Sequence, residues 1–437
     1  MVAKGQKGHL SDHIAGDSTR RLVARDALVL MTLTLIGSVL SFAFQWSMAR
    51  MLAPGQYATM FSVLAMLSIL AVPSQVVTVV ATRMASATLV SGGGHHLLRG
   101  AARGVGLAGL VGAVLWLAIA LARQPIAAFL NTTDQAAVVL LGAAAAVGLI
   151  APVARGVLNG ARAFVALGSL SISDAAFRIG TAVLLVALGA GTAGAIAATP
   201  ISTGLGVIFA MLVTWWLFRK EHAGPTASSA KQLPIDWPTN LRVAAVGLGI
   251  AVLLNVDVLI VRNAFGDDQA ALYAASALVG RTVLFASAPI ASVLLPHLMR
   301  NEAAGNTPGD LLSIGTILAA AVSGAVALTI LLAPEFVFDV IFGGRYEPLT
   351  ELVWGYVLAG TLFSIITLQA NLHIGIGRLR TWWSMLGIAA LCTITLAVRH
   401  ETLAQVIWTL NLFLTLAAAM QVVVTVNMLR ERHRHSA

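Results

Sequence analysis

Twelve long apolar blocks are the feature that most constrains this chain. Of its 437 residues, 58% are apolar and only 10% are charged, whereas a typical soluble domain has about 25% charged residues. A block of roughly 18 or more apolar residues can cross the hydrocarbon core of a bilayer as a helix. Because the backbone finds no water there, uninterrupted blocks of this length predict helices and not the strands of a barrel.

The blocks predict an all-α polytopic membrane protein with twelve transmembrane helices. The expected spans are residues 27–49, 57–82, 104–122, 136–154, 164–189, 194–218, 241–264, 270–296, 311–333, 353–374, 382–398 and 403–426. The stretch between the sixth and seventh spans is rich in proline, serine and charge, which is typical of a linker. The expected segments are an N-terminal segment (1–26), an N-lobe (27–218), a linker (219–240), a C-lobe (241–428) and a basic tail (429–437).

An internal repeat supports the division into two six-helix lobes. The residues Arg50, Tyr57, Ala58 and Pro73 recur as Arg262, Tyr273, Ala274 and Pro289, with the same spacing from tyrosine to proline. Membrane proteins built from such repeats are mostly transporters. A proline in mid-span removes a backbone hydrogen bond. Pro73 and Pro289 are therefore either fixed packing kinks or hinges for alternating access.

The basic residues predict the orientation of the chain. Twenty of the 27 lysines and arginines lie in the termini and the even-numbered connections, and five lie in the odd-numbered ones. This bias places both termini in the cytoplasm. The net charge of +9 therefore indicates topology and not a nucleic-acid partner.

The sequence before the first span lacks the pattern of a cleavable signal peptide, and the single cysteine, Cys392, excludes an internal disulfide.

Two apolar segments are too short to be spans. Residues 334–352 contain four acids among their apolar residues, a pattern that suits a helix lying at the outer membrane interface. Residues 125–130 occupy the matching place in the first half.

Arginine far outnumbers lysine and alanine is abundant, which favours a bacterial source with a GC-rich genome. We therefore expect a bacterial inner or plasma membrane.

Four ionisable side chains inside the spans are candidates for function, because such groups are costly in a bilayer. Asp174 and Arg178 lie four residues apart and share one helix face. They form either a self-neutralised pair that fixes a helix, or a site in which Arg178 faces a substrate path. The other two, Asp257 and Arg281, lie at comparable depths on adjacent spans, so they form either a structural pair or a functional site. In the functional reading, Arg281 binds a phosphate and Asp257 titrates or binds a cation.

The repeat offers an internal comparison for these charges. The counterpart of Asp257 in the first half is Gln45, and the counterpart of Arg281 is Ala65. If the repeated fold itself required these charges, both copies would contain similar residues. The asymmetry therefore favours a function for the two charges. Uncharged polar residues within the spans either join helices or contact a sugar; Gln45, Asn255 and Gln75 are the cavity candidates. The sequence shows no metal-ligand cluster and no catalytic nucleophile.

Several segments resemble the lipid-linked oligosaccharide flippases. These are ARMLAPGQYATMFSVLAML in the first half, ARGVLNGARAFVALGSLSISDAAFRIGTAVLLVALG around the fourth and fifth spans, NVDVLIVRNAF with ALYAASALVGRTVLFASAPIASVLLPHLMR in the second half, and PEFVFDVIFGGRY before the tenth span. The family is the polysaccharide branch of the multidrug/oligosaccharidyl-lipid/polysaccharide exporter (MOP) superfamily. The resemblance covers essentially the whole chain.

The resemblance implies a fold and a cargo. It implies two six-helix lobes around a central cavity that opens alternately to either side. It also implies that a polyprenyl phosphate or diphosphate bearing sugars moves from the cytoplasmic to the outer leaflet, for cell-surface polysaccharide biosynthesis. The expected partners are this lipid-linked glycan, membrane lipids, and glycosyltransferases or a polymerase of the same pathway; no cofactor is expected. Gln45, Asp257 and Arg281 would lie near the path.

Two other functions remain open. The chain could export drugs or other amphiphiles, but the multidrug members of the superfamily commonly carry an aspartate in the first span, and residues 27–49 contain no acid. It could also be a membrane glycosyltransferase that uses polyprenyl sugars, or a non-transporting scaffold for glycan assembly. The first outer loop has no acid, although such an enzyme typically needs acids on its outer loops. We therefore do not expect an enzyme.

Overall fold

The computed structural model describes residues 29, 32–90, 94–219, 236–303, 309–375 and 382–436, and within these ranges it consists of helices and their connections. The expected N-terminal segment and residues 220–235 of the linker lie outside the described residues. The helices are Thr32–Met51, α2 (Pro54–Leu70), α3 (Pro73–Val90), α4 (Gly94–Leu121), α5 (Arg123–Phe129), α6 (Gln135–Gly160), α7 (Phe164–Ala187), α8 (Gly191–Phe218), α9 (Trp237–Ala264), α10 (Asp267–Ala303), α11 (Gly309–Leu332), α12 (Pro334–Phe342), α13 (Thr350–Gly375), α14 (Trp382–Val398) and α15 (Leu403–Ser436).

Every predicted span corresponds to a helix or a bent pair of helices. Among the described residues, nine helices are long and apolar enough to cross a membrane. Two bent pairs pass the same test, α2 with α3 and Ala320–Leu332 of α11 with α12, and α14 is a shorter apolar helix. The break between α2 and α3 lies at residues 71–72, directly before Pro73, and the two helices are bent by 46°. By contrast, α10 continues through the equivalent Pro289, whose side chain lies outside the described residues.

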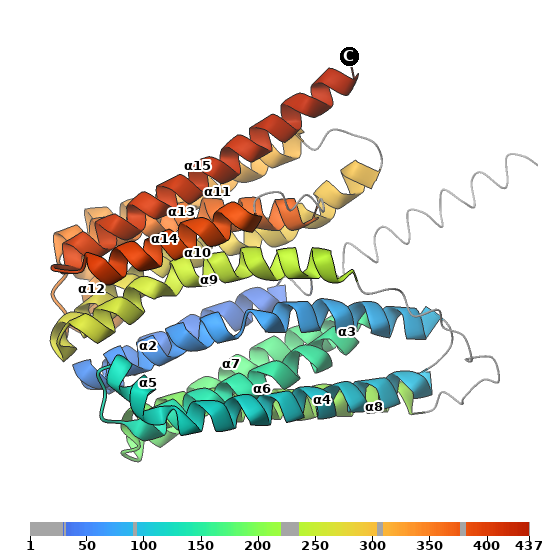
Figure 1. The fold of residues 1–437 in the computed structure, drawn as a ribbon, viewed down its shortest axis with the longest axis horizontal. Helices are drawn as coiled ribbons and strands as arrows, with labels where there is room; N and C mark the ends of the chain where they lie inside the picture. The colour runs from blue at the N-terminus through green and yellow to red at the C-terminus, as the bar shows by residue number, and fades with distance from the viewer. Residues whose placement is uncertain are drawn as a thin grey trace, which may run out of the picture.

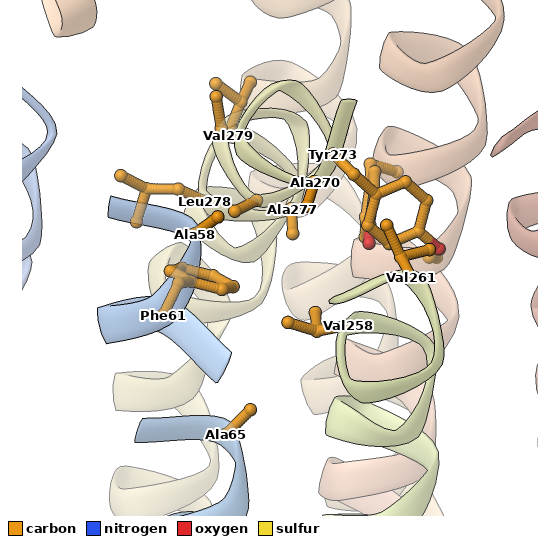
Figure 2. Packing of buried hydrophobic residues seen from close by; sticks show 14 of the residues in the cluster. Ala58, Phe61, Ala65, Val258, Val261, Ala270, Tyr273, Ala277, Leu278 and Val279 are labelled. Carbon is orange, nitrogen blue, oxygen red and sulfur yellow. The ribbon is translucent and has the colours of Figure 1, made fainter. Parts of the chain in front are cut away.

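The two halves of the chain form two groups of helices. Figure 1 shows the blue and green helices of the first half on one side and the yellow to red helices of the second half on the other. The main contact between the groups is made by α2, which packs on α9 and α10. In Figure 2, Ala58, Phe61 and Ala65 of α2 face α9 and α10. We call this contact surface the seam. The all-α fold with two repeated lobes is thus confirmed.

Both short helices that the sequence places outside the spans are present. The helices α11 and α12 are bent by 93° relative to each other, as expected if α12 does not continue the span. Its counterpart in the first half is α5. Figure 1 shows α5 and α12 at one end of the bundle and the C-terminus at the opposite end. We call the former the α5/α12 end.

Capping side chains explain where two of the helices, α6 and α9, begin. The carboxylate of Asp134 accepts a hydrogen bond from the backbone nitrogen of Ala137 at 3.1 Å and so caps α6. Asp236 caps α9 by accepting from both the backbone nitrogen and the hydroxyl of Thr239, at 3.2 and 2.6 Å. These side-chain oxygens satisfy helix donors that have no intrahelical partner. The two hydrogen bonds from Thr239 lower the pKa of Asp236, which keeps the cap ionised.

Candidate functional site

The buried acid of the second half, Asp257, is held by two tyrosines and not by a cation. It lies on α9 and is 1% exposed. The hydroxyl of Tyr356 donates to its Oδ2 at 2.6 Å, and the hydroxyl of Tyr273 donates to the same oxygen at 3.1 Å. The other oxygen, Oδ1, has no hydrogen-bond partner among the described residues. Because a buried polar atom without a partner is costly, a proton or a water at this oxygen would stabilise the acid.

Arg281 lies close to this acid but does not form an ion pair with it. The guanidinium donates to the carbonyl of Leu254 at 2.8 Å and to Oδ1 of Asn255 at 3.1 Å, one turn before Asp257 on α9. The ion pairs of the described residues, drawn within 4.0 Å, do not include Asp257 with Arg281. Of the two alternatives for these charges, the direct structural pair is therefore not formed. The tyrosines of α10 and α13 donate to Oδ2 of the acid, and Arg281 turns toward the seam.

At the seam, Arg281 contacts the opposite lobe. Its guanidinium carbon lies 4.8 Å from the centre of the Phe61 ring of α2, a distance typical of a cation–π contact. A small pocket beside it is lined by Leu254, Asp257, Arg281, Tyr356, Phe363 and Leu410, among others. The arginine thus carries a positive charge between the two lobes, and no carboxylate of the described residues neutralises it by direct contact.

Close helix packing positions these groups. A Cβ added to Gly280 of α10 would lie 2.5 Å from the carbonyl oxygen of Tyr356 on α13. Only a residue without a side chain lets the two helices approach so closely. This contact brings the hydroxyl of Tyr356 to Asp257 and fixes the position from which Arg281, the next residue, extends.

The first half has a cluster of a different kind around Asp174. Its Oδ2 lies 2.6 Å from the guanidinium of Arg178 and 3.9 Å from that of Arg155, and its Oδ1 accepts from the hydroxyl of Thr203 at 3.3 Å. The Asp174 side chain is 8% exposed, against 23% for Arg178 and 45% for Arg155. The i,i+4 pair expected from the sequence is present. Arg178 also lies over the Phe44 ring at 5.9 Å.

The structure corrects the place of Arg155. The expected fourth span ends at residue 154, which places Arg155 in the following connection, yet α6 extends to Gly160 and includes it. Its guanidinium lines a small pocket with Asp174 and Thr203. The cluster of two arginines and one acid therefore keeps one excess positive charge.

The remaining predicted polar residues occupy separate places. Asn255 is 1% exposed; it donates to the Ala251 carbonyl at 2.8 Å and accepts from Arg281. Gln75 on α3 lies beside Gly247 of α9, where α3 also contributes to the seam. Gln45 is half-buried on the first helix, and no described contact joins it to the other site residues. Within the described residues no group of three or more metal-ligating side chains occurs.

The sequence did not indicate that tyrosines hold the acid, although Tyr57 and Tyr273 belong to the repeat and the rarity of tyrosine was a usable signal. The chain has only four: Tyr57, Tyr273, Tyr346 and Tyr356. Their rings form two pairs, Tyr57 with Tyr346 at 6.3 Å and Tyr273 with Tyr356 at 5.1 Å. Each pair thus joins a repeated tyrosine to one from the region of α12 and α13. Only the second pair holds an acid.

These features define a polytopic helical protein of two repeated lobes with buried charges near their contact. Solved structures with the same fold include an inward-facing multidrug resistance transporter of the MATE family in the MOP superfamily. It is 13% identical, with 94% of this chain and 100% of that chain covered, at a TM-score of 0.69. A Vibrio cholerae MATE transporter is 14% identical, with 95% and 98% covered, at a TM-score of 0.64.

A third structure shows that the fold accommodates different pockets. A MOP superfamily transporter from Pyrococcus furiosus, described as having a binding pocket of reverse polarity, is 15% identical over 93% of this chain and 95% of that chain, with a TM-score of 0.57. No family model and no curated protein matches the sequence. The chain therefore has the fold of MOP superfamily transporters, as the resemblance predicted.

Proposed function

We propose that the chain is an alternating-access flippase for a polyprenyl phosphate or diphosphate that carries a sugar or oligosaccharide. The observation that carries the proposal is Arg281, a cation at the seam without a direct acidic partner. A guanidinium in a site of low dielectric binds phosphate strongly and with defined geometry. The polyprenyl tail can stay in lipid while the charged headgroup passes between the lobes.

The cluster around Asp174 supports the same class of cargo. Its excess positive charge favours an anionic headgroup over a cationic drug, and the exposed guanidinium of Arg155 is its most accessible part. Arg178 and Arg155 are therefore proposed as a second group that contacts the phosphate. Polar residues at the seam, such as Asn255 and Gln75, offer amides to the sugars.

Asp257 is proposed as the coupling residue. Its free Oδ1 and its two tyrosine donors can accept a proton or help to bind a monovalent cation without dismantling the cluster. On this account, Asp257→Asn abolishes the effect of an imposed ion gradient on transport. Exchange of cargo between the leaflets would persist.

Export of drugs or amphiphiles is the second candidate, and one observation favours it: the buried acid of Asp257 could attract an organic cation. Against it, the helix Thr32–Met51 contains no acid, and the cluster around Asp174 exposes the guanidinium of Arg155 and not the acid. A glycosyltransferase or a scaffold would require that the protein function without moving its lipid. These alternatives are outcomes of the following test.

The test compares cargoes in proteoliposomes. Purified protein is reconstituted with a fluorescent polyprenyl-diphosphate disaccharide, and flipping is followed by dithionite quenching; uptake of a cationic dye is measured in parallel. We expect protein-dependent flipping and no dye uptake. Dye uptake without flipping supports drug export, and sugar transfer to an acceptor by the purified protein identifies an enzyme. The absence of all three activities leaves a scaffold, and each of these three results contradicts the proposal.

A further inference from the structure

The repeated arginines Arg50 and Arg262 have a role that the proposed transport site does not use. Arg262 lies at the end of α9 and is 2% exposed. Its guanidinium donates to the carbonyls of Leu130 and Asn131, at 2.8 and 2.6 Å, directly after α5 of the opposite half. Asp267 of its own half pairs with it at 2.6 Å. The cation thus binds the negative end of a helix in the other lobe.

Arg50 makes the reciprocal contact. It lies at the end of the helix Thr32–Met51, and its guanidinium donates to the carbonyl of Ile341 at 3.0 Å and to that of Val340. Both carbonyls belong to the last turn of α12, in the second half. The Trp46 ring lies 5.0 Å from its guanidinium carbon. Arg50 is exposed, so this contact is the weaker of the two.

The receiving helices end in the same way. Residues in the left-handed conformation follow each of them: Asn131, with φ of 43°, after α5, and Gly343, with φ of 65°, after α12. The last carbonyls of a helix have no intrahelical donor, and the left-handed residue satisfies only some of them, so the others can accept from an outside donor. Each repeat therefore supplies one arginine and one acceptor helix, and the partners are exchanged between the repeats.

Further contacts across the seam reinforce this arrangement. Arg345, after α12, donates to the carbonyl of Leu52 at 3.0 Å. Asn263, next to Arg262, donates to the carbonyl of Phe129 at 2.7 Å. A Cβ on Gly55 would overlap the carboxylate of Asp267, so the glycine leaves room for the acid that holds Arg262. All these groups lie at the α5/α12 end.

We propose that Arg50 and Arg262 form a crossed latch that holds the two lobes together at the α5/α12 end and must release when that end opens. This inference depends on the alternating access of the proposed function, but it does not depend on which cargo is moved. Lobes that separate at this end must break both contacts, because each arginine and its acceptors belong to different lobes. Rigid-body movement of lobes over a bistable interface is a common form of such transitions.

The test measures the separation of the lobes at this end. In a Cys392→Ala background, Gln124→Cys on α5 and Gln269→Cys on α10 are exposed positions in opposite halves that can carry spin labels. Distances between the labels are measured by double electron–electron resonance in liposomes without cargo. Since hydrogen bonds to charged groups are being lost, Arg262→Gln is expected to raise the ratio of long to short distances about tenfold or more. Arg50→Gln should raise it by about twofold to fivefold, because that contact is exposed.

Matched controls keep the result interpretable. Arg399→Gln removes an exposed arginine near the same end whose side chain makes no described contact with the other half; it should leave the distances unchanged. Labels at Gln124→Cys and Gln135→Cys lie within the first half and should report one distance in every variant. If Arg262→Gln does not fold, Asp267→Asn should shift the ratio in the same direction by a smaller factor.

Unchanged distances in Arg50→Gln and in a folded Arg262 or Asp267 variant would overturn the latch. This outcome is distinct from failure of the proposed cargo, since the labels report lobe movement whether or not a glycolipid is flipped.

Discussion

The two lobes treat their buried acids in opposite ways. Asp174 in the first half is neutralised by Arg178 at 2.6 Å, with Arg155 close by. Asp257 in the second half accepts only from neutral hydroxyls, and the nearby Arg281 binds a carbonyl and an amide instead. The same fold thus carries a paired charge on one side and two separated charges on the other. A paired acid mainly supports structure, whereas separated charges remain available to a proton, a cation or a phosphate.

The largest expected difference between the lobes concerns stability. Asp174→Asn leaves Arg178 without its partner in a largely buried site. We expect a loss of about 3 kcal/mol in unfolding free energy, at the low end for a broken buried pair because Arg178 keeps some exposure. Thermal unfolding in detergent measures the change. The double variant Asp174→Asn with Arg178→Gln should recover most of the loss, and failure to recover would show that the pair is not the cause.

Asp257→Asn should behave in the opposite way. Its acid has no cationic partner, so the neutral amide removes a desolvation cost while the tyrosine hydroxyls can rotate to donate or accept. We expect an unchanged or higher unfolding temperature in the same detergent. A fall as large as that of Asp174→Asn would mean that Asp257 is also a structural ion, and the contrast between the lobes would fail.

Much of this comparison could be predicted from the sequence. The apolar blocks identify the helices because a helix in lipid needs a fixed length of apolar chain. The repeat identifies equivalent positions, and i,i+4 spacing identifies the Asp174–Arg178 pair. These features depend on neighbouring residues or on a count along the chain.

Contacts between distant helices could not be predicted in this way. Tyr356 reaches Asp257 across 99 residues because α10 and α13 approach closely at Gly280, and the sequence does not indicate which helices meet there. The end of a helix also matters: α6 extends by more than one turn beyond the expected span and brings Arg155 to Asp174. The comparable depths of Asp257 and Arg281 left open whether they pair, and the direction of the Arg281 side chain, toward Leu254 and Asn255, decided the contact.

The tyrosine hydroxyls should have the smallest effects. Tyr356→Phe removes the shorter hydrogen bond to Asp257, and Tyr273→Phe removes the longer one. We expect losses of about 1 kcal/mol and less than 1 kcal/mol, respectively, in thermal unfolding. The equivalent Tyr57→Phe is the control, since the hydroxyl of Tyr57 has no hydrogen-bond partner among the described residues. Equal losses in all three variants would show that the hydrogen bonds to Asp257 do not account for the effect.

The most direct test of the central claim is the flipping rate of Arg281 variants in the proteoliposome assay. Arg281→Ala removes the charge at the seam, and Arg281→Lys keeps the charge but loses the planar fork. We expect a loss of about tenfold or more for alanine and a partial loss for lysine. Arg123→Ala, which removes an exposed arginine elsewhere, should leave the rate unchanged. Wild-type rates in well-folded Arg281→Ala would contradict the claim that this arginine binds the phosphate of the cargo.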